Sequence, residues 1–170
     1  MTDLKKAKIK KVLKTTPGEI LRNTLQITEI PYEYIATKIK DVRDVVADLE
    51  CGENLFKDCI PNNQVYSFDH VAIDDTVIAC DMKETRLDSE SIDVTVFSLA
   101  LWGTNSDDYI KESYRILRRK GVIYIAEPSK NYETLEEQEK LIGTLNEVGF
   151  QQVSLIENRG KFIYLTGIKI

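Results

Sequence analysis

Apolar and polar positions alternate with two different periods along this chain of 170 residues. Short apolar runs typical of buried strands are followed by segments whose apolar residues recur at the spacing of one helix face. The predicted strands are 45–49, 65–68, 77–80, 93–98, 122–126, 153–156 and 162–168. This order predicts an α/β fold in which helices cover both faces of a mostly parallel sheet.

Three helices are predicted from the same pattern, at 31–40, 105–121 and 134–149. Asn105 can cap the start of the second helix, and the basic residues 118–120 precede Gly121 at its end. Thr134 and Glu137 have the spacing of a capping box at the start of the third helix. The connection between the last two strands is short and turn-like, so these strands should form an antiparallel hairpin.

Charge is distributed unevenly along the chain. Residues 1–14 contain six lysines and one aspartate, a sum of +5, which leaves −10 for residues 15–170 out of the overall −5. The basic arm could bind phosphate groups or act as a nuclear-targeting patch, although a solvated chain end is the simpler interpretation. We expect residues 1–30 to be an arm and leader, and residues 31–170 to be the folded domain.

The composition argues against several classes of protein. No window approaches the ~18 uninterrupted apolar residues of a membrane helix, and the lysine-rich start lacks the apolar stretch of a signal peptide. Cys51, Cys59 and Cys80 have no C-x-x-C spacing, which argues against a disulfide framework and a zinc site. We expect a soluble intracellular protein without a metal.

Three successive predicted strands end at or beside a carboxylate, namely Asp48, Asp69 and Asp81. Ligands of an open parallel sheet bind outside the carboxyl ends of its strands, and the first turn there needs small residues so that the backbone can approach the ligand. Gly52 meets this need, whereas Glu50 in the same turn does not. Asp69 can accept both hydroxyls of a ribose, as an acidic residue does in dinucleotide sites.

Five short segments occur in a characteristic order: V-A-D-x-x-C-G at 46–52, F-D at 68–69, C-D-M at 80–82, V-F-S-L-A-L-W-G-T-N at 96–105, and I-A-E-P-S at 125–129. Over roughly residues 30–170 the chain thereby resembles nucleomethylin and its ribosomal RNA-processing relatives. The resemblance implies a Rossmann-like class I methyltransferase with a seven-stranded sheet and an antiparallel last strand. It also implies S-adenosylmethionine as the cofactor and N1 of an adenine in ribosomal RNA as the methyl acceptor.

The resemblance implies roles for the residues at the strand ends. Asp69 would bind the ribose, Asp81 the adenine amino group, and Met82 the adenine ring, while Asp48 would orient the turn or bind the methionyl amino group. The full predicted cofactor set is Asp48, Glu50, Cys51, Gly52, Asp69, Asp81, Met82, Ser98 and Leu99. Carboxylates also cap turns at strand ends, so a purely structural interpretation remains open.

Glu50 departs from the family pattern, which has glycine at this position. Its charge would face the methionyl carboxylate and amino group, so Glu50 would either weaken cofactor binding or pair with the ammonium. A degenerate, non-catalytic module for cofactor binding or interaction is therefore an alternative. A methyltransferase for a protein or a small molecule is another, because a fold does not determine the substrate.

Methyl transfer requires mainly positioning, because the sulfonium of the cofactor is already reactive. The segment 98–105 should face the substrate, where Trp102 could stack a flipped base and Asn105 could form hydrogen bonds. Trp102 could equally be a core or lid aromatic. Glu127 could hold or deprotonate the adenine edge, and His70, the only histidine, is interpreted as a loop residue beside the ribose site.

The expected partner is RNA, with no membrane involved. Because the body of the chain is acidic, RNA binding should depend on residues 1–14 together with Arg115, Arg118, Arg119 or another local basic patch. The region ahead of residue 31 is short relative to the family, so a protein partner could supply an RNA-binding surface. We expect a nuclear or nucleolar location in a eukaryote and a cytoplasmic one otherwise.

Overall fold

A computed structural model of the chain describes residues 30–101, 103–159 and 161–170. The basic arm at 1–14 and Trp102 lie outside the described residues, so the predictions made for them remain predictions. Residues Pro31–Ile170 form one compact unit. Its strands are β1 (Val45–Leu49), β2 (Gln64–Asp69), β3 (Val77–Ala79), β4 (Ile92–Ser98), β5 (Leu117–Pro128), β6 (Gln151–Arg159) and β7 (Phe162–Ile168).

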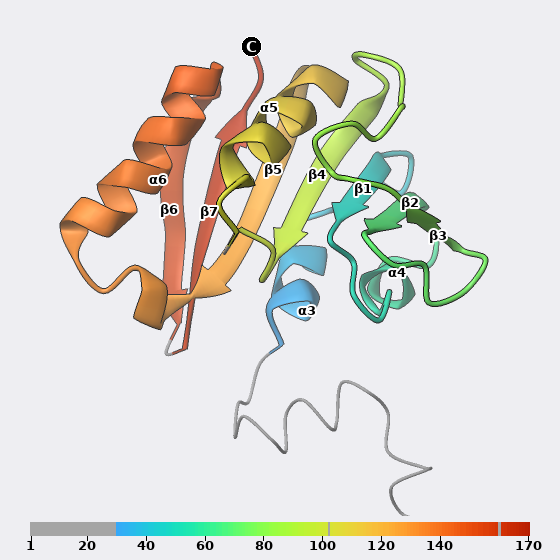
Figure 1. Ribbon diagram of the computed structural model, residues 1–170, viewed down its shortest axis with the longest axis horizontal. Helices are drawn as coiled ribbons and strands as arrows, with labels where there is room; N and C mark the ends of the chain where they lie inside the picture. Colours follow the sequence, from blue (N-terminus) through green and yellow to red (C-terminus); the bar gives the residue numbers. More distant parts are fainter. Residues whose placement is uncertain (1–29, 102, 160) are drawn as a thin grey trace, which may run out of the picture. The chain divides into compact units, whose positions relative to one another are not determined.

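These strands form one sheet in the order β3-β2-β1-β4-β5-β7-β6 (Figure 1). The pairs β1–β2, β1–β4, β2–β3 and β4–β5 are parallel. Strand β7 is antiparallel to both of its neighbours, β5 and β6. The predicted mostly parallel sheet with a reversed last strand is therefore confirmed, as is the final hairpin.

The helices in the described residues are α3 (Pro31–Ala36), α4 (Phe56–Cys59), α5 (Ser106–Ile116) and α6 (Leu135–Val148), with a 3-10 turn, η1, at Ser129–Asn131. Helix α5 connects β4 to β5, and α6 connects β5 to β6, so both connections move along the sheet in the same direction. Because crossovers between parallel strands are right-handed, both helices lie on one face of the sheet, as Figure 1 shows. Helix α4 connects β1 to β2 in the opposite direction and belongs to the other face. Helix α3 contacts α4, β4 and β5.

The central strands are buried because both faces of the sheet are covered. Every residue of β4 from Ile92 to Phe97 is buried, and Leu49, Phe68, Phe97 and Ile125 belong to one core cluster. Uninterrupted apolar runs are what such strands require. This burial explains why the sequence pattern located β1 and β4 closely.

The first helix is shorter than predicted, since it ends at Ala36 instead of residue 40. The N–H groups of residues 37–39 donate to carbonyls three positions earlier. The hydroxyl of Thr37 also donates to the carbonyl of Tyr34 at 2.7 Å. These short-range bonds tighten the chain into turns and replace the α-helical pattern.

The predicted extension of the second helix to Gly121 is wrong. Leu117 is already extended, with φ −64° and ψ 135°, and it pairs with Ile92 at the start of β5. The basic residues 118–120 therefore lie in the strand. A Cβ on Gly121 would lie 2.8 Å from the carbonyl oxygen of Arg118, so glycine is needed for this close approach within the strand.

The third helix agrees with its sequence signals. Thr134 and Glu137 form the complete capping box, and Gly149 follows the last turn with φ 120°. Asn105 precedes α5 as predicted, but its side chain makes no capping hydrogen bond. No helix in the described parts of the chain is long and apolar enough to cross a membrane.

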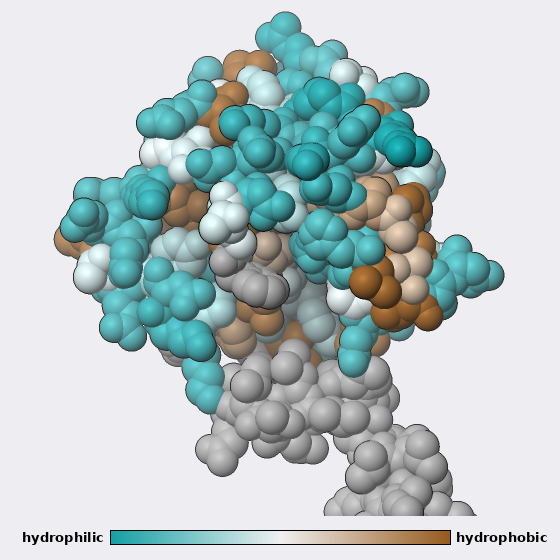
Figure 2. All heavy atoms as spheres, in the orientation of Figure 1, coloured by the Kyte–Doolittle hydropathy of each residue, from teal (hydrophilic) through white to brown (hydrophobic). Residues whose placement is uncertain are grey.

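The face shown in Figure 2 is mostly polar, with apolar side chains gathered over the β2–β3 region. The large exposed apolar residues of that segment are Val71, Ile73 and Ile78. Strand β3 is an edge strand of three residues. The edge of the sheet beside β3 is therefore short and partly apolar.

Candidate functional site

The carboxyl ends of neighbouring parallel strands lie at one level of the sheet. Leu49 pairs with Phe68 on one side and with Phe97 on the other. Asp69 pairs with Ala79 one strand further along. The turns that follow β1 to β4 therefore meet at one edge, as the acidic strand ends predicted.

The turn after β1 is held against the end of β2 by two hydrogen bonds that its backbone N–H groups donate, one to a carbonyl and one to a side chain. The N–H of Cys51 donates to the carbonyl of Phe68 at 2.8 Å, and the N–H of Gly52 donates to Oδ2 of Asp69 at 2.8 Å. Gly52 has φ +54°, and a Cβ there would meet no described atom within 4 Å. The glycine thus leaves open space beside the backbone, which a ligand can approach.

Asp69 orders both turns at this edge. Its Oδ2 accepts the Gly52 N–H, and its Oδ1 accepts the N–H of Val71 at 3.1 Å. Each carboxylate oxygen can accept a second hydrogen bond. Asp69 can therefore accept hydrogen bonds from a ribose while it holds the two turns.

Asp48 is a buried carboxylate directly below the turn. Its residue is 2% exposed, and burial, with a smaller contribution from nearby Asp69, raises its pKa to about 7. No described residue forms a hydrogen bond or an ion pair with its carboxylate. A carboxylate in this environment is stabilised by a cation, which the ammonium of an amino-acid group would supply.

Asp81 and Met82, which follow β3, lie in different environments. Oδ1 of Asp81 accepts the N–H of Lys83 at 3.1 Å, and Oδ2 lies 3.0 Å from the Lys83 ammonium. These hydrogen bonds hold the pKa of Asp81 below its usual value. Met82 is 0% exposed and belongs to the core cluster. Its side chain therefore packs in the core, and its predicted contact with an adenine ring stays a prediction.

The loop after β4 is anchored by a second buried acid, Glu127. Oε1 of Glu127 accepts the N–H groups of Ala100 and Leu101, both at 2.8 Å. The residue is 0% exposed, and burial raises its pKa to about 7. Glu127 thus binds the loop backbone through Oε1, and its predicted contact with the adenine edge stays a prediction.

The same loop begins with an unusual backbone conformation. Leu99 has φ +62°, and its N–H donates to the carbonyl of Ala126 at 2.8 Å. A left-handed leucine costs roughly 1–2 kcal/mol. Such strain persists where surrounding contacts fix the backbone, and the bonds from Glu127 to the next two residues do so here.

A chain of side-chain contacts crosses the site. Oε1 of Glu50 lies 3.1 Å from Nε2 of His70, and this nitrogen also lies 2.9 Å from the hydroxyl of Tyr109 on α5. Nδ2 of Asn105 donates to the same hydroxyl at 2.7 Å. The chain joins the β1 turn, the β2 turn and the start of α5.

Sequence reasoning did not identify Tyr109, because its apolar spacing on α5 indicates only a core position. Asn105 donates from Nδ2 to the Tyr109 hydroxyl, and its predicted hydrogen bond to the substrate stays a prediction. Ser98 and Leu99 are half-buried at the end of β4, beside the acceptor loop. Burial, with Asp48 and Asp69 close by, raises the pKa of the Cys51 thiol to about 12, so this cysteine remains protonated.

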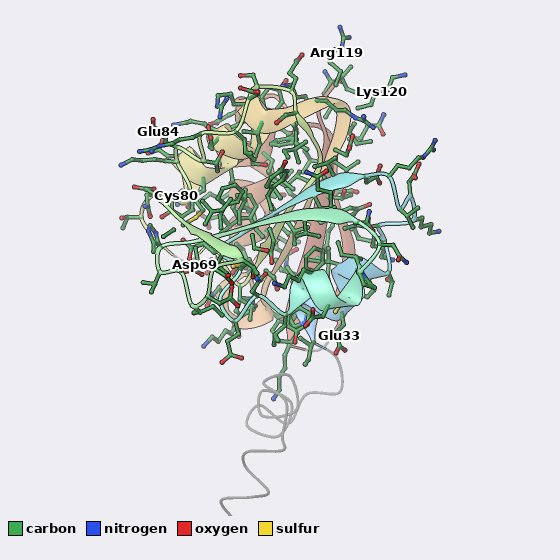
Figure 3. The ribbon with its side chains drawn as sticks, turned by 90° about the vertical axis from the view of Figure 1, so that its right-hand side faces the viewer. Glu33, Asp69, Cys80, Glu84, Arg119 and Lys120 are labelled. Atoms are coloured by element: carbon green, nitrogen blue, oxygen red, sulfur yellow. The ribbon has the colours of Figure 1, made fainter. Side chains whose placement is uncertain are left out.

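Positively charged residues predicted to contact RNA lie elsewhere. Figure 3 shows Arg119 and Lys120 toward the end of the sheet opposite Asp69. Arg118 forms an ion pair with Asp93, and Arg115 bonds to Glu112 through two nitrogens, at 2.7 and 2.8 Å. Arg118 and Arg119 lie at the start of β5, away from the base that would accept the methyl group at the carboxyl ends of the strands, so their contact with a longer RNA stays a prediction.

The strand order, the antiparallel β7 and the acidic ends of β1 and β2 define the class I, Rossmann-like methyltransferase fold. A family model described as "Hypothetical methyltransferase" matches residues 21–170, and the chain belongs to this family. The resemblance inferred from the short sequence segments is thereby confirmed.

Two curated relatives show the extent of the similarity. The Arabidopsis thaliana protein named "Ribosomal RNA-processing protein 8" is 47% identical over 89 residues, which cover 52% of this chain and 31% of the relative. The Schizosaccharomyces pombe "25S rRNA (adenine(645)-N(1))-methyltransferase" is 34% identical over 134 residues, which cover 77% of this chain and 42% of the relative. The chain therefore spans less than half the length of these relatives.

A solved structure supports the fold. The putative S-adenosyl-L-methionine-dependent methyltransferase from Methanococcus maripaludis has a TM-score of 0.66 and 14% identity. The match covers 81% of this chain and 83% of that chain. At this level of identity, the likeness shows that the two chains share the fold.

Proposed function

We propose that this chain transfers a methyl group from S-adenosylmethionine to a ring nitrogen of adenine in ribosomal RNA. The observation that carries the proposal is the open space at Gly52, in a turn that Asp69 binds and that follows the buried carboxylate of Asp48. The names of the relatives supply the nature of the acceptor. A nucleolar location in a eukaryotic cell and a protein partner that adds RNA-binding surface are parts of the same proposal.

The site fits the chemical groups of this cofactor. The buried carboxylate of Asp48 would bind the methionyl ammonium, and Asp69 would accept the ribose hydroxyls while it holds the Gly52 N–H. Asp81 is exposed enough to accept the adenine amino group, in competition with Lys83. When bound, the cofactor supplies a methyl group on an electrophilic sulfonium, which needs no activation by the protein.

The chain's own contribution is to position the acceptor. A ring nitrogen of adenine has a lone pair available, so a general base is not required for it to attack a methyl group. The loop after β4 must hold the base in line with the sulfonium, and Glu127 fixes this loop through two backbone bonds. We therefore assign Glu127 to loop positioning, and keep Trp102 as the predicted stacking residue.

Calorimetric titration with S-adenosylmethionine and with its demethylated product, S-adenosylhomocysteine, tests the cofactor assignment. Asp69→Ala should weaken binding by about tenfold or more, because it removes the ribose acceptor and the support of the Gly52 turn. Asp88→Ala is the matched control. Asp88 is an exposed carboxylate in the loop ahead of β4, and its removal should leave the affinity unchanged.

Transfer of a radiolabelled methyl group to total RNA, with protein extract as a parallel acceptor, tests the substrate. Labelled ribosomal RNA that yields methyladenine on digestion would support the proposal. Label in protein alone would assign a protein methyltransferase on the same fold. Failure of the wild-type chain to bind the cofactor would favour the degenerate, non-catalytic module that Glu50 first suggested.

A further inference from the structure

Glu50 occupies a position where a side chain is unfavourable for two reasons. Its φ of +66° lies in the left-handed region, which glycine adopts freely and in which a residue with a side chain is strained. Its carboxylate also adds to Asp48, Asp69 and Asp81 at the same edge of the sheet. A site for a cofactor that itself carries a carboxylate should not tolerate this additional charge unless a neighbouring group compensates for it.

The neighbouring group is His70. Its Nε2 lies 3.1 Å from Oε1 of Glu50, and the two side chains are 50% and 22% exposed, respectively. The pKa of Glu50 is raised by burial, lowered by His70, and raised again by Asp69 and Asp81. Lys83, the nearby lysine, is bound to Asp81. Among the described residues, His70 is thus the basic side chain that forms an ion pair with Glu50.

Hydrogen-bond geometry determines which form of His70 can perform this role. Nε2 carries at most one proton, yet it lies within hydrogen-bond distance of both Glu50 and the Tyr109 hydroxyl. A bond to the Glu50 carboxylate requires the proton on Nε2, because a carboxylate only accepts. The Tyr109 hydroxyl, which accepts from Asn105, can then share this proton only as a second acceptor, because a bond that it donated to Nε2 would require a bare nitrogen and would exclude the bond to the Glu50 carboxylate.

On the basis of the proposed function, we propose that His70 is a positioning residue for the cofactor. Its protonated Nε2 holds the Glu50 carboxylate, so that a turn with glutamate in place of glycine still accepts the carboxylate end of the cofactor. Glu50 and His70 therefore act as a pair. Glu50 without His70 would weaken cofactor binding, and His70 without Glu50 would have little effect on it. Tyr109 and Asn105 orient the imidazole from α5.

A double-mutant cycle tests this pair through its affinity for S-adenosylhomocysteine, measured by calorimetry on the full chain. His70→Leu alone should weaken binding by about tenfold, since it leaves Glu50 without its partner. Glu50→Gly should bind at least as tightly as the wild type. In the Glu50→Gly background, His70→Leu should have less than about a twofold effect, because no charge remains to be held.

A matched control cycle uses Asp41 and Arg43. This pair is also a short contact, at 2.6 Å, but it precedes β1 and so lies at the opposite edge of the sheet. Its variants should not change the affinity. Thermal unfolding of all variants separates a role of His70 in cofactor binding from a purely structural role. A purely structural role would lower the melting temperature equally in the wild-type and in the Glu50→Gly background, and the effects of the two substitutions on affinity would then be additive.

Two outcomes would overturn separate conclusions. If no variant, wild type included, binds the ligand, the proposed function fails and the role of His70 in it fails as well. If the wild type binds and the effects of Glu50→Gly and His70→Leu are additive, only the role of His70 fails. The calorimetric cycle therefore distinguishes the two failures.

Nitrogen NMR provides a readout that needs no cofactor. Because His70 is the only histidine in the chain, its two ring nitrogens give unambiguous signals. The wild type should show a protonated Nε2 whose signal shifts in Glu50→Gln and does not shift in Asp41→Asn. A spectrum with the proton only on Nδ1 would overturn the contact with Glu50.

Discussion

Glu127→Gln tests whether a buried acid anchors the acceptor loop. The carboxyl group is fully buried, and Oε1 accepts two backbone N–H groups while Oε2 has no hydrogen-bond partner among the described residues. Burial raises the pKa of Glu127 from 4.5 to about 7 in the folded protein. A glutamine has the same shape and an oxygen that can accept both bonds, but it never ionises.

The raised pKa determines the sign of the pH effect. The folded state favours the protonated acid, so the stability that this group contributes is complete below pH 4.5 and is lost as the pH rises toward 7. Between pH 5 and pH 8 the loss amounts to about 2 to 3 kcal/mol at 1.36 kcal/mol per pKa unit. Asp48, whose pKa is also raised to about 7, acts in the same direction.

Urea unfolding of the cofactor-free protein at pH 5 and pH 8 measures this difference. Glu127→Gln should lose about 2 to 3 kcal/mol less stability than the wild type over this interval, because the contribution of Glu127 is removed while those of the other carboxyl groups, Asp48 among them, are unchanged. Glu139→Gln, an exposed position on α6, should follow the wild type. Equal pH dependence in the wild type and in Glu127→Gln would refute the assignment of Glu127 as a buried acid with a raised pKa.

Two further substitutions separate the site from the scaffold. Gly52→Ala places a methyl group in the open space beside the turn, so cofactor affinity measured by calorimetry should fall by about tenfold or more. Because Gly52 has φ +54°, the stability measured by urea unfolding should also fall, by roughly 1–2 kcal/mol. Thr134→Ala breaks the capping box of α6, so stability should fall by about 1 kcal/mol, and an unchanged cofactor affinity would confirm that α6 serves only the scaffold.

The buried parallel strands were predictable from sequence because their apolar runs are continuous, but the start of β5 was not. The basic residues 118–120 and Gly121 have the local signature of a helix end. The outcome is decided by the pairing of Leu117 with Ile92, which lies 25 residues earlier in the chain. The helix propensity of a short segment does not depend on a contact so distant in the sequence, so the pattern favoured the helix.

The acidic strand ends were predictable for a different reason. A parallel sheet places the ends of neighbouring strands at one edge, so Asp48 and Asp69 could be assigned from their positions alone. This rule does not predict where each side chain points. Glu127 could be placed after β5, but its bonds to the loop backbone depend on how the loop folds over it. The contact between Tyr109 and His70 depends on how α5 packs against the β2 turn.

The proposed pairing of Glu50 with His70 explains how a departure from the family pattern can coexist with cofactor binding. The left-handed conformation costs roughly 1–2 kcal/mol relative to glycine. A hydrogen bond to a charged group contributes about 1.5–3 kcal/mol when shielded from water, and less here because His70 is half exposed. The two terms are of similar size, so the pair can roughly offset the backbone strain. Replacement of His70 alone removes this compensation and also leaves the Glu50 carboxylate unheld beside the carboxylate end of the cofactor, and this second effect is why the two positions should be coupled in binding.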